Sequence, residues 1–80
     1  MKLNIGSVVI ANAGRDGGGF FVVTGTDGNY RFIADGKSRK LASPKRKNMK
    51  HLCATDSMID INDITDKKLR ALLRELRSAE

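Results

Sequence analysis

Apolar residues in the first two thirds of the chain fall in short, alternating runs. These runs are too short for helices and are rich in β-branched and aromatic residues, which favours strands. The pattern predicts five strands, over about residues 6–12, 20–24, 30–34, 37–42 and 49–54. The second run is apolar on both faces, which is typical of a strand that is covered on both sides.

Glycine-rich turns separate the first strands. The loop from Ala13 to Gly19 holds four glycines in seven residues, and glycine reaches positive φ angles without steric cost. We therefore expect a tight, exposed loop that carries Arg15 and Asp16. Asp-Gly pairs at 27–28 and 35–36 predict two further turns.

The predicted fourth strand has Leu41 as its apolar anchor and ends at Pro44, before a polar stretch over 45–48. Five short strands with closely spaced turns indicate a small all-β barrel, because closure leaves fewer exposed strand edges.

The C-terminal part of the chain has a different pattern. Residues 55–64 are interpreted as an ordered linker, Thr65 as a helix N-cap and Asp66 as a first-turn acid that favours the helix dipole. Leucines at i, i+3, i+4 and i+7 then predict a short amphipathic helix with the stripe Leu69, Leu72, Leu73 and Leu76. The expected organisation is a barrel over residues 3–54, with a linker and a helix that packs on it over 55–80.

Composition limits the possible chemistry. With 80 residues, 40% of them hydrophobic and 30% charged, the chain is expected to form one small ordered domain. Cys53 and His51 are the only residues of their types, which argues against an internal disulfide and a zinc site. The first residues lack the apolar core of a signal peptide, and no apolar run approaches the length of a membrane span. We expect a soluble, cytoplasmic protein, monomeric and without cofactor or metal.

The positive charge is concentrated in one segment. The chain has a formal net charge of +6, yet eight basic residues and only one acid, Asp35, lie between Arg31 and His51. Such a patch binds phosphates by releasing condensed counterions, so it predicts a nucleic-acid partner. Arginine can hold phosphate through two hydrogen bonds, whereas lysine acts as a point charge. Tyr30, beside a turn, is the candidate for stacking on an unpaired base.

Enzyme motifs are not evident. The glycine loop leads into a strand and lacks the Gly-Lys-Ser/Thr end of a P-loop. The serines have no evident base partner, and the aspartates lie in turns and in the linker, so we expect no catalytic activity.

Three stretches, Gly6-Ser-Val-Val-Ile, Ala13-Gly-Arg-Asp and Phe21-Val-Val, together resemble the KOW motif of ribosomal proteins and transcription elongation factors. The later stretches Asp35-Gly-Lys-Ser-Arg-Lys-Leu and Pro44-Lys-Arg-Lys-Asn-Met-Lys-His-Leu are similar to small bacterial KOW-domain RNA-binding proteins. Those proteins are related to large-subunit ribosomal proteins of archaea and eukaryotes. The resemblance covers about residues 3–52 and implies an SH3-like barrel that binds RNA, with ribosomal RNA as the expected ligand.

Carried over by position, the KOW loop comprises Gly14, Arg15, Asp16 and Gly18. Relatives often have lysine or arginine where this chain has Gly17 and Gly19, which moves the predicted RNA contact toward the basic segment. The predicted RNA-binding residues are Arg15, Lys37, Arg39, Lys40, Lys45, Arg46, Lys47 and Lys50. The expected function is non-enzymatic RNA binding, ribosomal or associated with translation. The alternative is a protein-interaction module that uses the barrel edge or the leucine helix.

Overall fold

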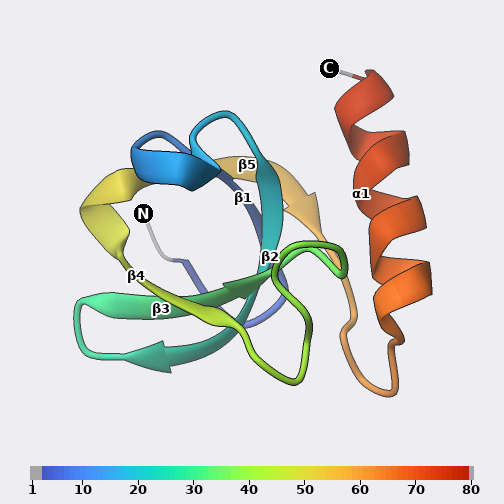
Figure 1. The fold of residues 1–80 in the computed structure, drawn as a ribbon, viewed down its shortest axis with the longest axis horizontal. Coiled ribbons are helices and arrows are strands. Elements are labelled where there is room, and N and C mark those ends of the chain that lie inside the picture. Colours follow the sequence, from blue (N-terminus) through green and yellow to red (C-terminus); the bar gives the residue numbers. More distant parts are fainter. Residues whose placement is uncertain (1–2, 80) are drawn as a thin grey trace.

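The computed structural model describes residues 3–79, which form an antiparallel sheet and a C-terminal helix (Figure 1). The strands are β1 (Ser7–Ala11), β2 (Phe20–Asp27), β3 (Tyr30–Ala34), β4 (Lys45–Asn48) and β5 (Leu52–Met58). Two short 3-10 helices, η1 (Gly14–Asp16) and η2 (Met49–His51), lie in the connections, and α1 spans Asp66–Ala79. Within residues 3–79, no helix has the length and apolar character needed to cross a membrane.

The strand order is β4-β3-β2-β1-β5, and every neighbouring pair is antiparallel. Within the described residues, hydrogen-bonded pairing stops at β4 and β5, so the sheet is open even though it curls strongly (Figure 1). η2 connects these two edge strands directly. The structure confirms a mostly β fold with a C-terminal helix, but it does not confirm the predicted closure of the sheet into a barrel.

The prediction of a fourth strand over 37–42 is wrong. The Asp35 carboxylate accepts hydrogen bonds from the backbone N–H of Lys37 and of Arg39, at 2.9 and 2.8 Å, and from the Ser38 hydroxyl at 3.1 Å. These bonds hold residues 35–39 in a closed loop, because one side chain takes the donors that a strand would offer to its neighbour.

The strand that pairs with β3 comes from the stretch predicted to be a polar connection. Ile33 pairs with Lys45 and Tyr30 with Asn48, so β4 is the entirely polar sequence Lys-Arg-Lys-Asn. As an edge strand β4 is held by its backbone pairing with β3, and it needs no apolar side chain of its own.

The predicted fifth strand is displaced. Residues 49–51 form η2, where the Asn48 side chain accepts a hydrogen bond from the Lys50 N–H at 3.1 Å. β5 begins at Leu52 and continues to Met58, so the first four residues of the predicted linker are strand. Pairing with β1 explains this extension, since Ser7 lies opposite Met58 across a register shift.

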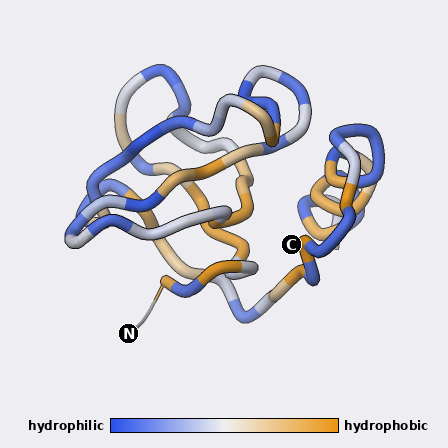
Figure 2. The backbone as a smooth tube through the Cα atoms, turned by 90° about the horizontal axis from the view of Figure 1, so that it is seen from below, coloured by the Kyte–Doolittle hydropathy of each residue, from blue (hydrophilic) through white to orange (hydrophobic). Residues whose placement is uncertain are grey.

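The core lies on both faces of the sheet, as the two apolar faces of β2 predict. On one face Phe21 and Val23 pack with residues from β1, β3 and β5. On the other face Val22 packs with Leu69 and Leu73 of α1. Hydrophobic residues accordingly concentrate in the central strands, and hydrophilic residues in the outer loops (Figure 2).

The helix begins as predicted, because the Thr65 hydroxyl accepts a hydrogen bond from the Lys68 N–H at 3.1 Å. Leu69 and Leu73 are buried, and Leu72 and Leu76 are half-buried beside them. The leucine stripe packs against the sheet, and full burial of one such leucine stabilises the fold by about 1.5–3 kcal/mol.

Candidate nucleic-acid interface

The glycine loop is compact. Gly14 and Gly18 have φ angles of +74° and +85°, which non-glycine residues rarely adopt. The Gly18 N–H donates to the Ala11 carbonyl at 2.7 Å and closes the loop around η1. Arg15 is exposed, as predicted. The prediction that Asp16 is exposed as well is wrong, since its side chain is only 8% exposed.

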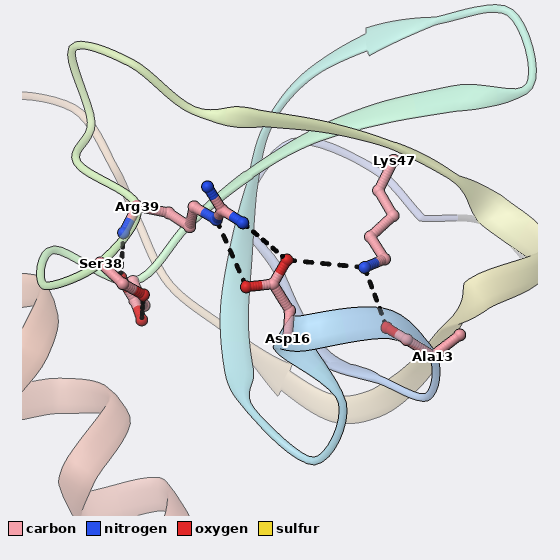
Figure 3. A network of polar contacts seen from close by, with 6 residues as sticks. Ala13, Asp16, Ser38, Arg39 and Lys47 are labelled. Atoms are coloured by element: carbon pink, nitrogen blue, oxygen red, sulfur yellow. Dashed lines mark hydrogen bonds and ion pairs between the residues drawn. The ribbon is translucent and has the colours of Figure 1, made fainter.

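Asp16 is buried because two cations from the basic segment converge on it (Figure 3). The Arg39 guanidinium donates through Nε and Nη2 to the two carboxylate oxygens, at 3.3 and 3.2 Å. The Lys47 ammonium lies 3.5 Å from the same carboxylate and donates to the Ala13 carbonyl at 3.0 Å. This Asp16 cluster ties the glycine loop, the β3–β4 loop and β4 together.

The pKa of Asp16 reflects two opposing effects. Burial alone raises the pKa of the carboxyl, but the hydrogen bonds and charges of Arg39 and then Lys47 outweigh burial and hold the pKa below its usual 3.8. Asp16 is therefore ionised at neutral pH, and its negative charge is balanced inside the protein.

Two more arginines of the basic segment contact other groups of the protein, Arg46 while remaining half exposed. Arg31 donates from Nε to the Leu3 carbonyl at 2.6 Å, and from Nη1 to the Gly28 carbonyl at 2.8 Å. The Arg46 guanidinium lies 3.7 Å from the centre of the Tyr30 ring. One face of Tyr30 is thus already covered by a cation, which argues against Tyr30 as an open base-stacking platform.

The remaining cations of the predicted set reach solvent. Four lysines are exposed, and within residues 3–79 no ion pair involves any of them: Lys37, Lys40, Lys45 and Lys50. Arg46 keeps a side chain that is 52% exposed and forms a 3.5 Å pair with Asp27, itself 60% exposed. These residues occupy the β3–β4 loop, the edge strand β4 and η2. We call Lys37, Lys40, Lys45, Arg46 and Lys50 the basic edge.

Sequence reasoning did not consider a second group of cations. Arg70, Arg74 and Arg77 of α1 line a pocket together with Lys37 of the basic edge. Their spacing of four and three residues was a signal, since it places them on one helical face.

Other kinds of site find little support. Within residues 3–79, no group of three or more histidine, cysteine, aspartate or glutamate side chains is placed to hold a metal ion. Cys53 is exposed, and its sulfur accepts a hydrogen bond from the Asn12 side chain at 3.2 Å. Comparison with protein-family models and with curated proteins finds no match for the chain.

Proposed function

We propose that the protein is a non-enzymatic RNA-binding protein and that the basic edge holds the RNA phosphates. The observation that carries this proposal is the arrangement of exposed lysines on an ordered strand and its flanking turns. Their ammonium groups have no acidic partners among the described residues, so their charge is available to phosphates.

The basic edge and the Asp16 cluster have different roles in this proposal. Arg39 and Lys47 keep the loop in place through Asp16, while Lys45 and Lys50 contact phosphates. Lysines act as point charges and few groups suited to base edges accompany them, so we expect weak sequence readout. Arg15, exposed on the glycine loop, adds one further contact.

The family assignment is part of the proposal. The KOW resemblance suggests ribosomal RNA as the ligand, a role in translation and a cytoplasmic setting. An SH3-like barrel is consistent with the curled sheet, in which β1 is flanked by β2 and β5 and η2 joins the two edge strands.

Two features disfavour the alternative of a protein-interaction module. Leu69 and Leu73 are buried against the sheet, so the centre of the leucine stripe is not available to a partner. The β4 edge carries Lys45, Arg46 and Lys47, and charged residues on an edge strand oppose the addition of another strand.

The test is the salt dependence of RNA binding. In Lys45→Gln/Lys50→Gln, the slope of log affinity against log salt should fall by about 0.7–0.9 for each phosphate that the variant no longer neutralises. Fluorescence anisotropy with labelled single-stranded and hairpin RNA between about 50 and 200 mM salt measures this slope. The control Lys67→Gln/Lys68→Gln removes the same charge from exposed positions on α1. Equal slopes for both variants would contradict the proposal.

A further inference from the structure

A pocket of about 190 Å³ lies between α1 and the sheet. Arg70, Arg74 and Arg77 line it from the helix, Lys37 and Asp35 from the β3–β4 loop, and Gly19 from the end of the glycine loop. Figure 1 shows the β3–β4 loop, in green, beside α1. Four cations thus face a space to which only one carboxylate contributes.

The three arginines are not paired with an acid among the described residues of the protein. Within residues 3–79, no ion pair involves Arg70, Arg74 or Arg77. Glu75, the only acid of α1 after its first residue, lines a separate hollow with Leu72 and Leu76. Like charges three and four residues apart on a helix repel one another. An anion in the pocket relieves that repulsion.

The carboxylate of Asp35 is already engaged. It accepts hydrogen bonds from the backbone N–H of Lys37 and Arg39 and from the Ser38 hydroxyl. These three donors are neutral, so the negative charge of Asp35 stays in the pocket, where the four cations outnumber it. Within residues 3–79 the guanidinium groups of α1 form no hydrogen bond or ion pair with this carboxylate, and their N–H groups are open to a ligand.

The β3–β4 loop is built closely against the helix. Gly36 has a φ of +79°, and a Cβ at this position would collide with the Asp66 carbonyl oxygen. The Leu41 N–H donates to the Asp66 carboxylate at 2.8 Å. These two contacts hold the loop on the first turn of α1, so Lys37 and Arg70 line the same pocket from different elements.

We propose that this pocket binds one phosphate group, held by Lys37, Arg70, Arg74 and Arg77. Arginine forks match phosphate oxygens through paired hydrogen bonds, which makes phosphate a better fit than a spherical anion. The volume is below the roughly 300 Å³ at which pockets for drug-sized ligands begin, so the site suits one phosphate and a few waters. The ligand is either a free phosphate or a phosphodiester of a nucleic acid.

Three of the four residues lie outside the basic edge, so this proposal does not depend on RNA binding there. The test is NMR of the full chain, following the Gly19 amide and the Nε–H signals of Arg70, Arg74 and Arg77. Inorganic phosphate is titrated in one arm, and a single-stranded RNA without terminal phosphates in the other. Shifts of these signals with phosphate alone identify a free-phosphate site, and shifts with RNA identify a phosphodiester site.

Arg70→Gln/Arg74→Gln should weaken the binding of whichever probe shifts the pocket signals, phosphate or RNA, by about tenfold or more. Lys67→Gln/Lys68→Gln makes the same charge change on the same helix outside the pocket and should bind as the wild type does. Lys37→Gln removes a pocket cation without altering α1 and should weaken binding even if the helix variant does not fold. The proposal is overturned if neither probe shifts the pocket signals. It is also overturned if the pocket variants and the control bind equally.

Discussion

Replacing Asp16 by asparagine tests whether the Asp16 cluster holds the loops together. The change keeps the size of the side chain but removes the charge that Arg39 and Lys47 share. Lys47, with a side chain that is 11% exposed, then has no anionic partner and only neutral acceptors such as the Ala13 carbonyl. A cation buried without its counter-charge is costly, so the folded state should be destabilised.

The magnitude follows from the exposure of the partners. Removing one partner of a fully buried ion pair costs about 3–5 kcal/mol. Arg39 is 29% exposed and can turn toward water, which lowers the cost. We expect Asp16→Asn to lose about 2–3 kcal/mol. The free energy of unfolding of an 80-residue domain is roughly 4–12 kcal/mol, so this loss is a large share of its stability.

The measurement is urea unfolding followed by circular dichroism, with the midpoint and the slope fitted separately. Asp27→Asn is the matched control, because Asp27 pairs with Arg46 where both side chains are more than half exposed. Exposed pairs contribute about 0–1 kcal/mol, so this variant should unfold close to the wild type. If the two variants lose the same free energy, the burial of the Asp16 cluster does not stabilise the fold.

Two further predictions concern pH and the helix. Folding lowers the pKa of Asp16, so the ionised carboxylate stabilises the fold in full above its unfolded pKa of 3.8. This stabilisation is lost as the pH falls toward and through the pKa of the folded state. The difference in unfolding free energy between wild type and Asp16→Asn should therefore shrink below about pH 3.8, and a constant difference down to about pH 2 would contradict the lowered pKa. Leu69→Ala should cost about 2–5 kcal/mol because Leu69 is fully buried, and half-buried Leu72→Ala should cost less. Thermal unfolding of both variants checks this order.

Local signals were enough to predict β3, the position of β1, the start of β2 and the start of α1. These elements carry alternating or helical apolar patterns, and Thr65 gives the helix a recognisable cap. β4 has no apolar residue, so a hydrophobic pattern could not reveal it. The segment over 37–42 was predicted as a strand because Leu41 could anchor it. Leu41 packs instead with the core on the α1 side of the sheet, from a loop.

Composition could not predict which cations pair within the protein and which reach solvent. The basic segment was correctly located as a run of charge, but its members differ through interactions with residues that are distant in sequence. Arg39 lies 23 residues from Asp16, and the burial of that carboxylate depends on how the β3–β4 loop folds. A charge count treats Arg39 and Lys45 alike, although one is engaged within the protein and the other is exposed.

The Asp16 cluster sets the stability of this small domain against the number of cations that remain free to bind an anion. Asp16 occupies, from inside the molecule, the position toward Arg39 and Lys47 that a phosphate oxygen of a ligand could otherwise take. While Arg39 and Lys47 pair with this carboxylate and stabilise the loops, they are not available to an external polyanion. If the protein binds RNA as proposed, Asp16→Asn should therefore lower the stability of the fold and raise the affinity for RNA.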